Sequence, residues 1–143
     1  MENTSMSYEY IRGLVEGEGC FTFCSAGVLM IPTFIIQMHE RDTQLLVKMK
    51  NTLKLHNKVK VYKNRTRRDN YNRAPMARFM VRDIGQLKNI IVPLFYKKLH
   101  GYKGVQFEMW MERIGSDPRV PNRHKFIYKI YKAGFYDKNP KYE

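Results

Sequence analysis

The apolar residues near the start of the chain recur at spacings that predict one helix followed by two strands. The helix is expected to begin after Ser7, a favourable N-cap residue, and to end at Gly19. Its apolar residues share one face, at Tyr8, Ile11, Leu14 and Val15. The strands cover 20–25 and about 29–39, and the second is apolar enough to be buried in part on both faces.

The middle of the chain repeats this order of elements. Asp42 can cap a second helix. The residues of that helix that face inward are Leu45, Leu46, Met49 and Leu53. A half-buried strand over 58–64, a basic loop over 65–73 and a strand over 77–81 are expected next. Asp83 can cap a third helix, with Gln86 at the capping-box position and Pro93 at its end.

Two further helices are expected at 103–113 and 122–132, separated by prolines. The order of elements is therefore αββαββα, followed by helices. This order predicts an α+β fold in which helices cover one face of a four-stranded antiparallel sheet and leave the other face free. We expect a single domain over 1–143, with a core over about 7–114 and a helical extension over about 115–143.

Positive charge is the strongest feature of the composition. The 143 residues include 26 Lys and Arg against 13 Asp and Glu, a net charge of +13 that indicates a polyanionic partner. Nine of these bases fall between positions 58 and 82, where the one acid is Asp69. Because this basic block is strand-like and does not form an amphipathic helix, nucleic acid is favoured over anionic lipid.

The composition also excludes several classes of protein. A hydrophobic content of 43% with 13% aromatic residues is enough for one core and is unlike a disordered chain. No run of 18 apolar residues occurs, and positions 1–7 lack the features of a secretory signal. Two cysteines, Cys20 and Cys24, suggest a reducing compartment. No zinc-finger spacing, Gly-rich phosphate loop or serine nucleophile motif is present.

The first predicted helix carries residues that a core helix does not need. Gly13 and Gly17 share a face, where each costs about 1 kcal/mol relative to alanine but allows another backbone to approach closely. Glu16 and Glu18 lie at the C-terminal end, where the helix dipole disfavours acids. They are either ordinary surface acids or partners of a divalent cation. Two such helices packed about a two-fold axis would bring carboxylates together, as metal-dependent phosphodiester hydrolysis requires.

This helix also contains a recognisable motif. Residues 11–19, Ile-Arg-Gly-Leu-Val-Glu-Gly-Glu-Gly, closely resemble the LAGLIDADG motif of homing endonucleases. The departures are Ile11 for the leading Leu, Arg12 for Ala, and Glu for both Asp residues. Later segments resemble the same family, namely 32–34, 41–46, 90–95 and 99–103. The resemblance therefore extends over about 8–110.

The resemblance implies a single-motif member of the family, with the αββαββα sheet serving as a DNA-binding saddle. Such a protein would work as a homodimer and cleave both strands of a long palindromic or pseudo-palindromic DNA site. Mg²⁺ or Mn²⁺ would support cleavage, whereas Ca²⁺ would bind without supporting it. Glu18 and Gly17 would hold the metal, and Glu16 would face away from it. The residues of the dimer interface would be Ile11, Gly13, Leu14 and Gly17.

Two further catalytic positions follow from the resemblance. Lys103 matches the family's late basic residue, which supports the charge of the transition state or the solvent network. Gln37 is the nearest polar residue at the end of the second strand, where the family organises water near the metal. The alternatives are Lys97 and Lys98 for the lysine, and His39 and Met38 for the polar residue.

The resemblance places the free face of the sheet in the DNA major groove. Strand alternation assigns nine residues to this face: Thr22, Cys24, Ile35, Lys58, Lys60, Tyr62, Asn64, Arg78 and Met80. Four arginines of the basic loop are expected to contact phosphates: Arg65, Arg67, Arg68 and Arg73.

Two other functions fit parts of the sequence. A protein with this fold that binds nucleic acid without cleaving it, such as an intron RNA maturase or a DNA-binding regulator, keeps the sheet and loses catalysis. A basic RNA-binding structural protein does not explain the glycine-spaced helix with terminal acids. No small-molecule cofactor or membrane partner is expected. Localisation would follow the host genome, in an organelle, a bacterial cytoplasm or a phage-infected cell.

Overall fold

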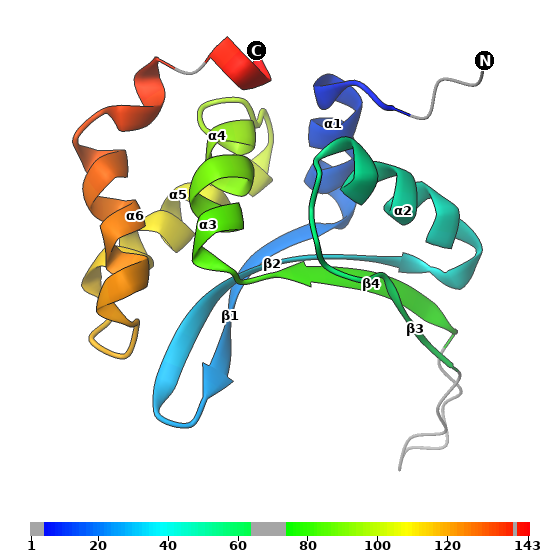
Figure 1. Ribbon diagram of the computed structural model, residues 1–143, viewed down its shortest axis with the longest axis horizontal. Coiled ribbons are helices and arrows are strands. Elements are labelled where there is room, and N and C mark those ends of the chain that lie inside the picture. Colours follow the sequence, from blue (N-terminus) through cyan, green and yellow to red (C-terminus); the bar gives the residue numbers. More distant parts are fainter. Residues whose placement is uncertain (1–4, 64–73, 139) are drawn as a thin grey trace.

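Four antiparallel strands form one sheet in the order β1-β2-β4-β3. The computed structural model describes residues 5–63, 74–138 and 140–143. The strands are β1 (Gly19–Ala26), β2 (Leu29–His39), β3 (Lys60–Tyr62) and β4 (Met76–Val81). Both ends of the sheet bend toward the side that carries no helix, so that side is concave, as the saddle predicts (Figure 1).

The helices lie on the other side of the sheet (Figure 1). The α-helices are α1 (Tyr8–Glu18), α2 (Thr43–Thr52), α3 (Ile84–Gln86), α4 (Val92–Phe95), α5 (Tyr102–Ser116) and α6 (Asn122–Lys132). Shorter helical turns are η1 (Glu40–Asp42), η2 (Leu87–Ile91), η3 (Phe135–Asp137) and η4 (Pro140–Tyr142). This α+β architecture has the expected order αββαββα followed by helices. Within the described residues, the helices are too short or too polar to cross a membrane.

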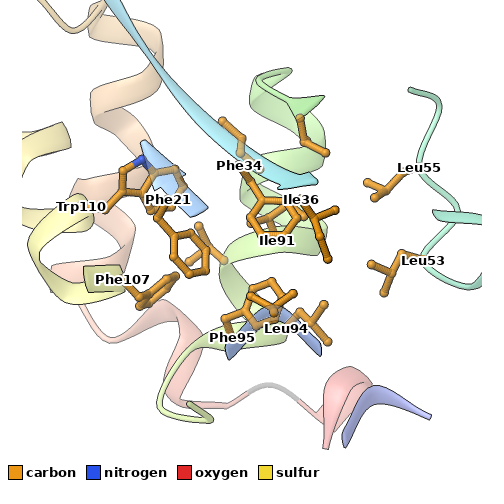
Figure 2. Packing of buried hydrophobic residues seen from close by; sticks show 14 of the residues in the cluster. Phe21, Phe34, Ile36, Leu53, Leu55, Ile91, Leu94, Phe95, Phe107 and Trp110 are labelled. Atoms are coloured by element: carbon orange, nitrogen blue, oxygen red, sulfur yellow. The ribbon is translucent and has the colours of Figure 1, made fainter. Parts of the chain in front are cut away.

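An aromatic cluster joins the sheet to the helices (Figure 2). Its centre is Phe21 of β1, whose ring centroid lies 5.2–5.5 Å from those of Phe34, Phe95, Phe107 and Trp110. The Trp110 indole N–H donates to the Thr22 carbonyl at 2.7 Å, so the one polar atom of this side chain is satisfied. The cluster therefore attaches α4 and α5 directly to the strand that follows α1.

Two of the predicted helix caps were wrong. Asp42 occupies the N-cap position of α2 but makes no side-chain cap hydrogen bond, since the preceding residues already form the turn η1. Asp83 does cap α3, but the Gln86 side chain does not complete a capping box. Its amide accepts from the His56 N–H at 2.8 Å and donates to Asn57 at 3.0 Å.

The helical path also continues past Pro93. Residues 87–91 form a π-helical turn, and Pro93 then lies in the first turn of α4, where proline is tolerated. The helix therefore ends at Phe95 and not at Pro93. The third strand is also shorter than expected, and Val61 is 40% exposed, so β3 is an edge strand that buries little.

Candidate functional site

Helix α1 passes into strand β1 with no residue between them. Glu18 is the last residue of α1 and is exposed, and Gly19 is the first residue of β1. The Gly19 N–H donates to the Val15 carbonyl and closes the helix. A Cβ at position 19 would lie 2.5 Å from Val15 Cγ1 and 3.0 Å from the Val15 carbonyl oxygen, so the change from helix to strand requires glycine. The Glu18 carboxylate is thus presented to solvent at a fixed corner.

Lys103 reaches this corner from α5. Its Nζ donates to the Gly19 carbonyl at 2.6 Å, one residue from Glu18. Lys97 lies elsewhere, with its Nζ 3.3 Å from Asp137 Oδ1, and it lines a separate hollow together with Lys98. Of the three lysines considered from the sequence, Lys103 is the one brought next to Glu18.

Gln37 lies on β2 beside the end of α1. The preceding residue, Ile36, pairs with Gly19, and Gln37 itself pairs with Arg78 of β4. Gln37 is exposed, whereas Met38 packs against the hydrophobic core. His39 is two residues further from the corner and accepts the Arg41 N–H through Nδ1. By register, Gln37 is the polar side chain of this strand that lies nearest Glu18.

Glu16 makes contacts that the sequence analysis did not foresee. One carboxylate oxygen accepts the His100 N–H at 2.9 Å, and the other accepts the Gly101 N–H at 3.0 Å. Gly101 is the N-cap of α5, where backbone N–H groups lack helical acceptors and an anion is favourable. No local pattern reveals this contact, because the partners are more than 80 residues apart. Glu16 therefore contacts the backbone at the start of α5.

The glycine face of α1 is open. Gly13 and Gly17 are exposed, and a Cβ added at either position would meet nothing within 4 Å. Tyr10, on the same face, is 52% exposed, and Leu14 is partly buried. Ile11 was expected at this face, but it is completely buried in the core on the opposite side of the helix, so it is not available to a partner.

Arg12 lies on the buried side of α1. It is 3% exposed, and its Nε donates to the Leu94 carbonyl at 2.8 Å. Its terminal nitrogens contact the Glu9 carboxylate and the Tyr142 carbonyl. The arginine in the place of the motif's Ala therefore attaches α1 to α4 and to the C-terminal turn.

Seven of the nine side chains that alternation assigned to the free face of the sheet share one face in the strand register. The register places Ile35 beside Cys20 and Met80, and Arg78 beside Gln37 and Lys60. The predicted residues that share this face are Thr22, Cys24, Ile35, Lys60, Tyr62, Arg78 and Met80. Lys58 is exposed but precedes β3. Five predicted residues lie outside the described ranges: Asn64, Arg65, Arg67, Arg68 and Arg73.

Cys20 belongs to the same face but was missing from the predicted set. It is exposed and has the parity of Thr22 and Cys24 along β1, so strict alternation from Thr22 identifies it. Its pairing with Ile35 places it one residue from the corner at Gly19.

The β3 end of this face is hollowed. A depression of about 320 Å³ is lined by basic and polar side chains from β3, β4 and the segments beside them. Its lining residues are Asn57, Lys58, Lys60, Tyr62, Arg78, Phe79, Met80 and Arg82. The Arg78 guanidinium lies over the Tyr62 ring, 4.5 Å from the centroid. The arrangement suits contact with an anionic, hydrogen-bonding surface.

The metal-binding capacity of one chain is small. Across the described ranges, no group of three or more His, Cys, Asp and Glu side chains is placed to hold a metal ion. Glu18 supplies one carboxylate, and the last turn of α1 supplies backbone carbonyls that lack helical donors. Oxygen donors of these kinds fit Mg²⁺ and Ca²⁺, which take carboxylate, carbonyl and water ligands. One chain therefore offers oxygen donors of a suitable kind but too few of them to surround an ion.

The sequence matches a protein-family model over most of its length. The model for LAGLIDADG endonucleases matches residues 11–114, from α1 to α5. The chain belongs to the LAGLIDADG endonuclease family. The matched range contains both acids of the motif, all three candidate lysines and the whole sheet.

Solved LAGLIDADG structures share the fold. The homing endonuclease I-GzeII, in complex with its DNA target, is 24% identical with a TM-score of 0.59, and the match covers 99% of this chain and 47% of that one. I-SmaMI, bound to uncleaved DNA in the presence of calcium ions, is 21% identical with a TM-score of 0.60. That match covers 87% of this chain and 43% of I-SmaMI. The homing endonuclease I-TnaI is 20% identical with a TM-score of 0.57. That match covers 90% of this chain and 98% of I-TnaI. The chain thus spans less than half of the first two proteins and nearly all of the third.

Proposed function

We propose that this protein is a site-specific homing endonuclease that cleaves both strands of a long palindromic or pseudo-palindromic DNA site as a homodimer. The observation that carries the proposal is the corner between α1 and β1. There an exposed carboxylate, Glu18, lies beside an open glycine face, and Lys103 contacts the adjacent carbonyl of Gly19.

Dimerisation through α1 would complete the metal site. Gly13 and Gly17 leave room for a second helix at close distance, as small residues do where helices pack tightly. Two α1 helices related by a two-fold axis would bring two Glu18 carboxylates to the middle of the assembly. The match to less than half of I-GzeII supports a DNA-binding body built from two units of this size.

The residues at the corner have distinct proposed roles. Glu18 and the Gly17 carbonyl would hold Mg²⁺ or Mn²⁺, and Ca²⁺ would occupy the site without supporting cleavage. When bound, the metal lowers the pKa of a water molecule and stabilises the leaving oxygen. Lys103 would place positive charge near the scissile phosphate, and Gln37 would orient water through its exposed amide. The calcium-containing complex of I-SmaMI with uncleaved DNA supports the assignment of a divalent ion.

DNA would lie along the concave face of the sheet. Side chains of β1, β2, β3 and β4 on this face would contact base edges in the major groove. Each protomer would cover about one turn of duplex, so the whole site would span on the order of 20 bp. The net charge of +13 supports this partner, because phosphate neutralisation dominates the affinity of proteins for DNA.

Cleavage of a randomised DNA library in Mg²⁺, followed by sequencing of the new ends, tests the proposal. We expect defined ends from the wild-type protein and none from Glu18→Gln, which should still bind DNA. A matched control is Glu108→Gln, which changes an exposed acid on α5. Unchanged cleavage by Glu18→Gln contradicts the metal role, and a single chain on each DNA site in sedimentation contradicts the shared centre. Sequence-specific binding without wild-type cleavage favours a maturase or a DNA-binding regulator.

A further inference from the structure

We infer that Glu16 is a positioning residue, which holds the start of α5 so that Lys103 stays against the Gly19 carbonyl beside Glu18. The inference rests on the proposed function, because that function gives Lys103 its catalytic role. The two acids of the motif then have separate tasks: Glu18 binds the metal, and Glu16 places the lysine.

Two short contacts connect the same two segments. Glu16 accepts the N–H groups of His100 and Gly101 at 2.9 and 3.0 Å, just before α5 begins. Lys103, two residues after Gly101, donates to Gly19, three residues after Glu16, at 2.6 Å. The segment 100–103 is thus attached at two points, through Glu16 and through Gly19. The Glu16 contact therefore restricts the position of the Lys103 backbone.

The chemistry of the first contact explains why an acid is suited to position 16. Two adjacent N–H groups point at this side chain, and a carboxylate has an acceptor oxygen for each of them. The negative charge also lies at the N-terminus of a 15-residue helix, where it is favourable. A Cβ at position 101 would lie 3.3 Å from Glu16 Oε1, so glycine at the N-cap allows this approach.

The second contact depends on the first because Lys103 is a long side chain with many rotamers. Immobilising such a chain costs about 1.5–2 kcal/mol of conformational entropy, which offsets most of what one hydrogen bond from a charged group contributes, so the contact to Gly19 is well populated only when the backbone of Lys103 is already in place. Lys103 is partly buried, whereas Lys98, five residues earlier, is exposed. Glu16 therefore acts through Lys103 and does not itself touch the metal or DNA.

Amine labelling tests the positioning without any need for activity. The full-length wild-type protein, Glu16→Ala and the control Glu108→Ala are treated briefly with an amine-acetylating reagent. Acetylation of Lys103 and of the exposed reference Lys98 is then followed by mass spectrometry. We expect Glu16→Ala to raise the ratio of Lys103 to Lys98 labelling by about tenfold, the size expected for loss of a hydrogen bond from a charged group. An unchanged ratio in a folded Glu16→Ala protein overturns the inference.

A double-mutant cycle on cleavage separates positioning from general stabilisation. We expect Glu16→Ala to lower kcat by about 10–100-fold with DNA affinity unchanged, and to have no further effect in a Lys103→Ala background. If the fold-losses in kcat of Glu16→Ala and Lys103→Ala multiply in the double variant, Glu16 acts independently of Lys103, and the inference is overturned. If Glu16→Ala does not fold, Glu16→Gln, which keeps one acceptor oxygen, takes its place in both experiments. Absence of wild-type cleavage would reject the proposed function, while the labelling ratio would still decide the position of the lysine.

Discussion

The guanidinium of Arg78 lies over the ring of Tyr62, with 4.5 Å between the guanidinium carbon and the ring centroid. Both side chains belong to the free face of the sheet, and Arg78 pairs across the strands with Gln37 on one side and Lys60 on the other. Stacking on an aromatic ring limits the rotation of an arginine. Arg78 is therefore an oriented basic side chain on this face and, in the proposed complex, a candidate for reading a guanine edge.

Replacement of Arg78 should change both affinity and sequence preference. In the proposed complex, Arg78→Ala would remove a two-pronged contact to one guanine in each half-site, which corresponds to about 1–3 kcal/mol of discrimination. Selection of bound sequences from a DNA library at fixed salt would show relaxed preference at that position. Lys50→Ala, on α2 and away from the free face, removes the same charge as a control. Uniform weakening with no change in preference would mean that Arg78 contacts phosphate.

Substitution of Gly13 should separate assembly from folding. A Cβ at position 13 meets no atom within 4 Å, and glycine is unfavourable by about 1 kcal/mol inside a helix, so thermal stability of the isolated Gly13→Leu chain should stay the same or rise. The added side chain would block close packing of two α1 helices, and sedimentation should detect one chain on DNA in place of two. Leucine at exposed Asn51 of α2 is the control. Two chains per site in Gly13→Leu would place the interface elsewhere.

Arg12 should contribute to stability and not to DNA binding. Arg12→Ala leaves the carbonyls of Leu94 and Tyr142 without their donor, and a buried unsatisfied acceptor costs about 1–3 kcal/mol. Urea unfolding should therefore show a loss of that order, and DNA affinity measured well below the melting temperature should be unchanged. The exposed Arg41 provides a control, since Arg41→Ala removes the same charge from the surface. An unchanged unfolding midpoint would contradict the structural role.

The turn between α5 and α6 should weaken in acid. Hydrogen bonds from the Arg119 guanidinium, and then from the Arg119 backbone N–H, hold the pKa of Asp117 well below its ordinary value of 3.8. A lowered folded pKa means that the ionised carboxylate stabilises the fold above pH 3.8 and that this stabilisation is lost as the pH falls further. The melting temperature of Asp117→Asn should thus be lower than that of the wild-type protein at pH 7. The difference between the two melting temperatures should narrow as the pH falls below about 4.

The control for this prediction is Glu108→Gln, which removes the same charge from an exposed acid on α5. The role of the ionised carboxylate would be contradicted if the difference in melting temperature between wild type and Asp117→Asn stayed constant from pH 7 into the acid range.

Elements governed by neighbours in sequence were predictable. The Ser7 hydroxyl accepts the Tyr10 N–H as an N-cap should, and β2 spans Leu29–His39 as expected. Contacts between distant segments were not predictable, because periodicity does not specify which groups meet. The Gln86 amide bonds to residues about 30 positions away, and Arg12 reaches a carbonyl 82 positions away. In both cases a buried polar group found a tertiary partner that no local rule specifies.

In the candidate site, too, local features were predictable from the sequence and contacts between distant segments were not. The glycine pair and the two acids of α1 were visible in the sequence, because their spacing and their place at a helix end are unusual. Choosing Lys103 over Lys97 required the structure, since a shift of a few residues in the resemblance exchanges them. The error at Ile11 arose because residues two apart in a helix, such as Ile11 and Gly13, face nearly opposite sides, and the motif alone does not show which side belongs to the core.

The direct passage from α1 to β1 at Gly19 has a consequence for engineering. Without an intervening loop, the carboxylate of Glu18 and each side chain along β1 are separated by a fixed number of strand steps of about 3.3 Å. In the proposed enzyme, the distance from the cut to each recognised base pair is thus a property of the backbone. Exchange of the side chains at Thr22 and Cys24 could redirect the protein to new targets without moving the point of scission.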